Sequence, residues 1–252
     1  MIIAANWKMF KTVSETTEFV KDLHRRREEL EGTRVIVCPP FTSLAAAREN
    51  QEGNVFALGA QNVHWENEGA FTGEISPAML HDLGVTYVIV GHSERRHIMG
   101  ETDEMINGKL QALLQYDLVP IFCVGETEEE REEGRMVEVL KTQIRKGLEG
   151  LKPVHLHQLL VAYEPVWAIG TGKAATAEDA AEASRLIRAT VDELGDGAGE
   201  QLQVLYGGSV KEANIGQFVS LPEIQGALVG GASLKVDSMV GLTRAAQEAV
   251  KN

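Results

Sequence analysis

Short apolar segments recur along the chain, and each is followed by a longer amphipathic segment. Val, Ile, Leu and Ala fill consecutive positions in the short segments instead of alternating with polar residues, which is typical of strands covered on both faces. The eight predicted strands are residues 2–7, 34–38, 55–61, 85–91, 119–124, 159–163, 203–206 and 225–229. Apolar residues at helical spacing predict helices over residues 14–30, 102–116, 127–148, 176–194 and 235–250.

This alternation predicts the fold class. An α/β barrel, (β/α)8, with eight parallel strands and surrounding helices typically needs about 250 residues, which suits this chain. A doubly wound open sheet gives the same alternation and is the main alternative, but eight units in this length favour closure. Because no linker, low-complexity tract or charge-block boundary interrupts the series, residues 1–252 are predicted to form one domain. Two helix starts carry capping pairs, Thr127 with Glu130 and Thr176 with Asp179.

Composition and charge narrow the class of protein. The 252 residues are 44% hydrophobic and 24% charged, as in ordinary soluble globular proteins. The net charge of −13 argues against a nucleic-acid-binding surface, although a local site can still bind a small anion. Cys38 and Cys123 lie far apart, so we expect neither a disulfide framework nor a cysteine-rich metal site. Without an export signal or a long apolar run, a cytoplasmic protein that spans no membrane is predicted.

Polar and titratable residues gather after the predicted strands. Catalytic groups of such barrels lie at the carboxyl ends of the strands, where this chain has Asn6, Lys8, His92 and Glu164. Glu164 ends an apolar strand, where desolvation of a carboxylate is costly. It is therefore either a catalytic residue or a member of an ion pair with a neighbouring Lys or Arg. His92 is either a neutral proton donor or a cap on a turn. Lys8 either pairs with Glu94 or supports a developing oxyanion, and one lysine can do both.

Two glycine pairs follow the last two strands. They are 207–208 and 230–231, each at the expected start of a helix, where close backbone N–H groups suit a phosphate. The alternative is that the glycines only permit tight turns. The segment after Glu164 starts with Pro165 and Trp167 and continues with small residues over 168–172, a composition that suits a lid with rigid ends. An ordinary irregular loop is the alternative.

Together these residues resemble the triosephosphate isomerase family from the first strand to the eighth. The similar motifs are 6–9 (NWKM), 60–63 (AQNV), 69–76 (GAFTGEIS), 90–96 (VGHSERR), 123–126 (CVGE), 163–172 (YEPVWAIGTG), 206–210 (YGGSV) and 227–234 (ALVGGASL). The resemblance implies a TIM barrel that interconverts dihydroxyacetone phosphate and glyceraldehyde 3-phosphate through an enediol(ate), in glycolysis and gluconeogenesis, without metal or organic cofactor.

The resemblance also implies a role for each site residue. Glu164 would be the base and His92 the neutral acid, a pairing that is an established example of pKa tuning in this family. Asn6 and Lys8 would polarise the substrate oxygens, with Glu94 supporting Lys8. The remaining implied residues are Ser93, which would hold Glu164 in an open state, Cys123 and Trp167 as supporting residues, and Gly170, Ser209, Gly230 and Gly231, whose backbone N–H groups would hold the phosphate.

The family further implies a homodimer. The loop over residues 61–76 has an apolar tip, so the tip either packs against a partner subunit or folds onto its own barrel. In the dimer, Phe71 and Thr72 would lie at the interface, with Thr72 reaching toward the neighbouring active site. Four positions depart from the usual family pattern and bear on packing and the interface rather than on the chemistry; they are Ala5, Phe10, Met99 and Gln225.

Some signals point elsewhere and are weaker. Residues 170–175 match a loose dinucleotide pattern, but five residues separate them from their strand, and Ala174 rules out a phosphate-binding Walker loop. His155 and His157 suggest a metal-binding pair, but they precede the sixth strand. They therefore lie toward the end of the barrel that serves stability rather than catalysis. A retaining glycosidase that uses Glu94 and Glu164 is a rival function, which the low aromatic content disfavours. A non-catalytic anion-binding scaffold is another, which the intact set of polar strand-end residues disfavours.

Overall fold

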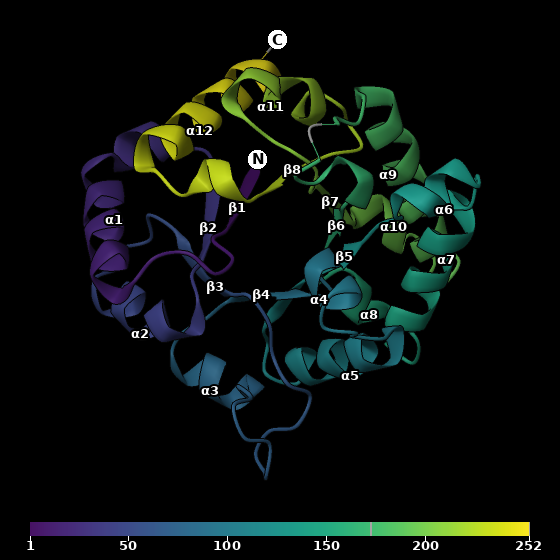
Figure 1. The fold of residues 1–252 in the computed structure, drawn as a ribbon, viewed down its shortest axis with the longest axis horizontal. Coiled ribbons are helices and arrows are strands. Elements are labelled where there is room, and N and C mark those ends of the chain that lie inside the picture. Colours follow the sequence, from purple (N-terminus) through teal and green to yellow (C-terminus); the bar gives the residue numbers. More distant parts are fainter. Residues whose placement is uncertain (172, 252) are drawn as a thin grey trace.

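The computed structural model, which describes residues 1–171 and 173–251, is a closed barrel of eight parallel strands (Figure 1). Each strand pairs with its neighbours in sequence, and β1 closes the barrel by pairing with β8. The predicted (β/α)8 barrel is therefore confirmed over the open sheet. The strands are β1 Ile2–Asn6, β2 Arg34–Cys38, β3 Ala57–Ala60, β4 Tyr87–Val90, β5 Val119–Val124, β6 Leu160–Tyr163, β7 Gln203–Tyr206 and β8 Gly226–Val229.

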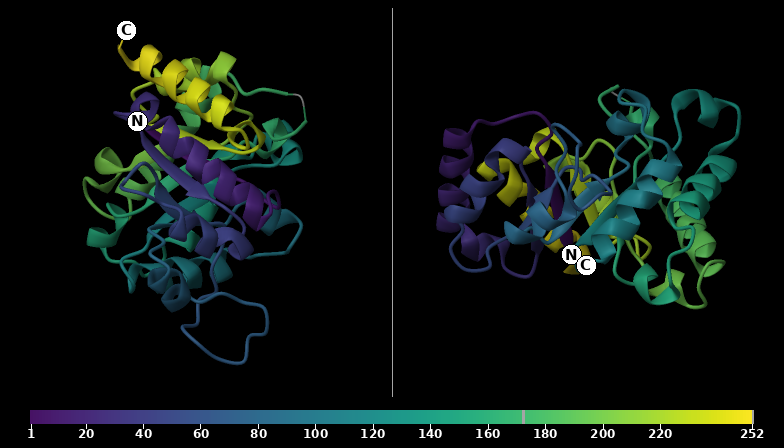
Figure 2. Two further views of the ribbon diagram at one scale, coloured as in Figure 1. Left: turned by 90° about the vertical axis from the view of Figure 1, so that its left-hand side faces the viewer. Right: turned by 90° about the horizontal axis from the view of Figure 1, so that it is seen from below.

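Helices form a ring outside the strands (Figures 1 and 2). Over the described ranges they are α1 Val13–Arg25, α2 Phe41–Glu49, α3 Pro77–Asp82, α4 Ser93–His97, α5 Asp103–Leu114, α6 Glu128–Glu132, α7 Met136–Gly147, α8 Pro153–Leu156, α9 Ala177–Asp192, α10 Ala198–Gln201, α11 Glu212–Val219 and α12 Val236–Lys251. Short 3-10 turns cover Arg27–Leu30, Val166–Ala168 and Gly231–Ser233. None of the helices in the described part of the chain is long and apolar enough to cross a membrane.

The strands are buried on both faces, which explains their continuous apolar sequence. In β1, Ile2 and Ala4 belong to the cluster inside the barrel, whereas Ile3 and Ala5 pack into the larger cluster under the helices. A residue that meets apolar neighbours on either face gains by being apolar, so no alternation is visible. All eight predicted strands are present, and their ends differ from the prediction by at most two residues.

Two predicted helices are too long. The helix predicted over 127–148 is wrong as one element, because Gly134 takes a left-handed φ of +72° between α6 and α7. The helix predicted over 14–30 ends at Arg25 and continues only as a 3-10 turn. The predicted capping pairs at Thr127 and Thr176 are confirmed, each with reciprocal hydrogen bonds.

The barrel brings the predicted site residues to one rim. Asn6 is the last residue of β1, Glu164 directly follows β6, and His92 lies two residues beyond β4. Gly207 and Gly230 directly follow β7 and β8. Because all strands are parallel, their carboxyl ends share one face, and residues far apart in sequence become neighbours there.

Candidate active site

A cavity of about 280 Å³ opens at the carboxyl ends of the strands. Its lining contains the candidate chemical groups Asn6, Lys8, His92 and Glu164, together with both glycine turns. The remaining lining residues are Ile169, Gly170, Ser209, Val210, Lys211, Leu228 and Ala232. Glu94 instead lines an adjoining hollow on the other side of Lys8. Sequence patterns did not predict the lining residues Ile169, Val210, Lys211 and Leu228, because neither their residue types nor their spacing indicates a site.

Glu164 is buried and held by two partners. The backbone N–H of Ser93 donates to its Oε2 at 2.9 Å, and Nε2 of His92 lies 3.0 Å from Oε1. His92 caps the start of α4, where its Nδ1 accepts the backbone N–H of Glu94 at 3.2 Å. Since Nδ1 accepts, the proton of a neutral imidazole lies on Nε2 and points at the carboxylate.

The two side chains shift one another's pKa. Burial raises the pKa of Glu164, but His92 and the Ser93 N–H outweigh burial, so the net pKa is below the ordinary 4.5. For His92, burial lowers the pKa, but the carboxylates of Glu164 and Glu94 together outweigh burial, so the net pKa is above the ordinary 6.5. The contribution of Glu164 to stability is thus present above pH 4.5 and lost as the pH falls through its folded pKa. The contribution of His92 is present below pH 6.5 and lost as the pH rises through its folded pKa.

We expect Glu164→Gln to lower the pKa of His92. The substitution removes the negative charge that raises this pKa, whereas burial, which lowers it, remains. An NMR titration of the imidazole, assigned with a His92→Gln variant, measures the shift, and His155 in the same spectra serves as the internal control. An unchanged pKa of His92 would show that Glu164 is not its main electrostatic partner.

Lys8 has an unusual backbone conformation and three polar anchors. Its φ is +52°, in the left-handed region that rarely holds a residue other than glycine. Its N–H donates to Asn6 Oδ1 at 3.0 Å, and its Nζ lies 2.6 Å from Glu94 Oε1, so the predicted ion pair is present. Gln61 donates to the carbonyl of Lys8 at 2.8 Å, a contact that sequence reasoning missed although Gln61 lies in a family motif. Strain of this kind persists where surrounding contacts fix a side chain in place.

Close packing explains the glycine residues of one turn but not those of the other. A Cβ on Gly207 would lie 2.9 Å from Cγ of Glu164, and one on Gly208 would lie 2.2 Å from the hydroxyl of Tyr206. Close packing therefore accounts for the first pair. Around Gly231 no atom lies within 4 Å of such a Cβ, and Gly230 meets only the end of Lys8. Packing does not account for the second pair, whose backbone is left open toward the cavity.

Trp167 and Cys123, which are expected to support the site, do not line the cavity. The indole N–H of Trp167 donates to Glu126 Oε1 at 2.8 Å, so this side chain is anchored on the loop after β5. The carbonyl of Cys123 accepts a hydrogen bond from Arg96 at 3.1 Å, and burial raises the pKa of its thiol, which stays neutral. Gly170 lines the cavity with a φ of +72°, whereas Gly172, which belongs to the same motif, lies outside the described residues.

The residues that line the cavity disfavour a glycosidase. Among the described residues that line the cavity, none is aromatic, and a glycosidase usually presents aromatic platforms to its sugar. Within residues 1–171 and 173–251, no group of three or more His, Cys, Asp and Glu is placed to hold a metal ion. His155 lies in α8 and His157 just after it, before β6 and away from this rim.

Phe71 and Thr72 do not line the cavity of their own chain. Both are exposed on the loop between β3 and α3, which projects beyond the ring of helices (Figures 1 and 2). The alternative of a loop folded onto its own barrel therefore does not hold for its tip.

Comparison with known proteins places the chain in a family. The family model for triosephosphate isomerase matches residues 1–246. Curated relatives named triosephosphate isomerase are 53% identical in Carboxydothermus hydrogenoformans, over 96% of this chain and 97% of the relative, and 52% identical in Dictyoglomus thermophilum, over 96% and 98%. The relative of the same name in Dictyoglomus turgidum is 51% identical over 96% of this chain and 98% of the relative. A match of this extent, on a closed barrel with the motif residues gathered at one rim, shows that the chain belongs to the triosephosphate isomerase family.

Proposed function

We propose that this enzyme interconverts dihydroxyacetone phosphate and D-glyceraldehyde 3-phosphate by proton transfer through an enediol(ate), without metal or organic cofactor. The observation that carries the proposal is the buried carboxylate of Glu164, 3.0 Å from His92 Nε2, in a cavity that Lys8 and Asn6 also line. A base, a proton donor and a fixed cation are the groups that enolisation of a hydroxy carbonyl compound needs. The name of the family supports triose phosphates as the substrates.

The proposed chemistry starts when Glu164 turns from Ser93 toward the substrate and removes the proton on the carbon next to the carbonyl. His92 then no longer faces a carboxylate. Burial and the Glu94 N–H at Nδ1 both disfavour the imidazolium, so His92 acts as a neutral acid that donates from Nε2 to the developing oxyanion. Lys8 and Asn6 stabilise the same negative charge. The resulting imidazolate of His92 then takes a proton from the other hydroxyl of the enediol, while Glu164 delivers its proton to the neighbouring carbon. This second pair of transfers forms the new carbonyl, restores both side chains and completes the isomerisation.

The phosphate would be held locally. The backbone N–H groups of Gly170, Ser209, Gly230 and Gly231 are proposed as its donors, with Lys8 as the nearby cation. Such a site does not need a positively charged surface, so it is compatible with the net charge of −13. Residues 166–171 and 173–176, which we call the lid segment, would cover the site and exclude water. Exclusion of water strengthens these interactions and protects the reactive enediol phosphate.

A coupled assay tests the proposed function. Dihydroxyacetone phosphate should be converted to glyceraldehyde 3-phosphate, and inorganic phosphate should inhibit competitively, because it occupies the N–H groups without offering a carbon to attack. Acetate is the control anion and should not compete at the same ionic strength. No turnover would overturn the proposal, and turnover without competition by phosphate would overturn the glycine-turn assignment.

We also propose a homodimer. Several large apolar side chains are exposed, with Met9 94%, Ile98 73% and Met99 65% exposed. Met9 and Met99 line the hollow beside Lys8, and the projecting loop with Phe71 and Thr72 offers a protrusion of the kind that could fill such a hollow. In a twofold dimer each copy would insert its loop into the partner's hollow, so that Thr72 reaches the neighbouring active site.

Light scattering on the purified protein should give about twice the chain mass of 27.5 kDa. Met99→Glu should weaken the dimer by about a hundredfold or more, because burying an unpaired charge costs roughly 3 kcal/mol. Val250→Glu, at an exposed apolar residue on α12, is the matched control and should leave the mass unchanged. A monomeric wild type would contradict the dimer.

The chain is further proposed to act in glycolysis and gluconeogenesis in the cytoplasm, without nucleic-acid partners.

A further inference from the structure

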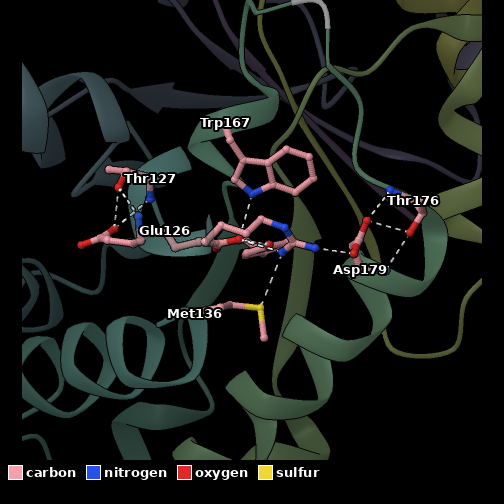
Figure 3. Close-up of polar contacts among 9 residues, drawn as sticks. Glu126, Thr127, Met136, Trp167, Thr176 and Asp179 are labelled. Atoms are coloured by element: carbon pink, nitrogen blue, oxygen red, sulfur yellow. Dashed lines mark hydrogen bonds and ion pairs between the residues drawn. The ribbon is translucent and has the colours of Figure 1, made fainter. Parts of the chain in front are cut away.

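A single arginine contacts groups at both ends of the lid segment. Arg131 lies in α6, the short helix that follows β5, and its side chain is 30% exposed. Its Nη1 donates to Glu126 Oε1 at 3.1 Å, and its Nη2 donates to Asp179 Oδ1. Figure 3 shows Glu126 and Trp167 on one side of this group of contacts, with Asp179 and Thr176 on the other.

The beginning of the lid segment depends on Arg131 through Glu126. The carboxylate of Glu126 has no exposed surface, and its Oε1 accepts from the Trp167 indole at 2.8 Å and from the Tyr163 hydroxyl at 3.0 Å. Arg131 supplies a positive charge to this carboxylate and also stacks on Trp167, with its guanidinium carbon 4.4 Å from the ring centroid. A buried carboxylate needs such a partner, so loss of Arg131 would loosen the anchor of Trp167.

The end of the lid segment depends on Arg131 through Asp179. Thr176 caps α9, and Oδ2 of Asp179 accepts both its backbone N–H at 2.9 Å and its hydroxyl at 2.7 Å. Arg131 bonds to the other oxygen of the same carboxylate. The arginine therefore fixes the rotation of Asp179, and with it the point where the lid segment joins α9.

We propose that Arg131 is a positioning residue that holds the two ends of the lid segment at a fixed separation. The inference rests on the proposed function, because only a working lid gives this geometry a kinetic consequence. Trp167 lies three residues after Glu164, so a loosened Trp167 would misplace the base as well as the Gly170 N–H. Lysine cannot replace the arginine, because a single ammonium offers neither a planar face to the indole nor a fork that spans two carboxylates.

The test compares Arg131→Met and Arg131→Lys with Arg26→Met. Arg26 is a matched control, because it is 31% exposed and pairs with two carboxylates, Glu29 in the 3-10 turn after α1 and Asp237 in α12. Hydrogen–deuterium exchange of the amides over 166–171 is expected to speed up by about tenfold in Arg131→Met and by less in Arg131→Lys. Exchange in this stretch should stay as in the wild type in Arg26→Met.

Kinetics supply the second measurement. Arg131→Met is expected to lower kcat by about tenfold and to release more inorganic phosphate per isomerisation, because the enediol phosphate escapes and eliminates. Unchanged exchange over 166–171 in both Arg131 variants would overturn the inference, as would an equal effect in Arg26→Met. Faster exchange in a protein whose wild type does not isomerise triose phosphates would contradict the proposed function and still support the positioning role.

Discussion

Glu164→Gln is expected to lower kcat by about 10²- to 10⁴-fold, the range in which a well-placed general base contributes. Glutamine has nearly the same shape, and its carbonyl oxygen can still accept the Ser93 N–H, so the local packing is preserved. An amide cannot take up a proton at neutral pH. The chemical step should therefore fail while substrate still binds, so that kcat falls and KM changes little.

Steady-state kinetics measure this effect, with thermal unfolding as a check on folding. Glu193→Gln is the control, because Glu193 is exposed and forms ion pairs with Arg145 and Lys141 far from the cavity. It should retain activity within about twofold, since exposed ion pairs contribute little. Turnover in Glu164→Gln close to that of the wild type would show that another group is the base.

Lys8→Met is expected to lower kcat/KM by about 10²- to 10³-fold, as when a preorganised electrostatic contact to a developing oxyanion is removed. The Nζ of Lys8 lies at the cavity wall beside Glu94, and the strained backbone and Gln61 fix its position. Methionine keeps most of the length and removes the charge. The affinity for inorganic phosphate should fall in parallel, because this cation also faces the proposed phosphate donors at Gly230.

The matched control is Lys21→Met, at an exposed lysine of α1 outside the cavity. It changes the net charge by the same amount, so it separates a local electrostatic effect from a general one. Its kcat/KM should stay within about twofold, because charges beyond a Debye length of about 10 Å are screened. An equal loss in both variants would contradict the local role of Lys8.

The strands were predictable because burial on both faces leaves an apolar segment that ends where the strand ends. The division of 127–148 at Gly134 was not predictable, because residues 128–133 are all Glu or Arg, which favour a helix as strongly as the spaced apolar residues after Gly134 do, and only the left-handed φ reveals the break. Residues at strand ends were predictable as a group from the barrel rule. Their contacts were not, since the bond from the Ser93 N–H to Glu164 joins residues 71 positions apart.

The glycine turns show a second limit of the sequence. Gly207 and Gly230 occupy equivalent positions after their strands. Close packing against Glu164 leaves no room for a side chain at Gly207, whereas Gly230 has such room. The departures from the family pattern also gain a physical account only from the structure. Gln225 accepts from Arg188 at 2.6 Å and from the N–H of Val204 at 2.9 Å, so it ties α9 to β7. Phe10 and Met99 are exposed, and Ala5 is fully buried in β1.

The most direct test of the central claim, proton transfer by Glu164 through an enediol(ate), is isomerisation of dihydroxyacetone phosphate in D₂O by enzyme treated with a chelator. The proton on Glu164 exchanges with solvent, so NMR should show deuterium at carbon 2 of the glyceraldehyde 3-phosphate that forms. Glu164→Gln should form almost none of this product. Formation of deuterated product by Glu164→Gln at the wild-type rate would show that another group transfers the proton and would contradict the account.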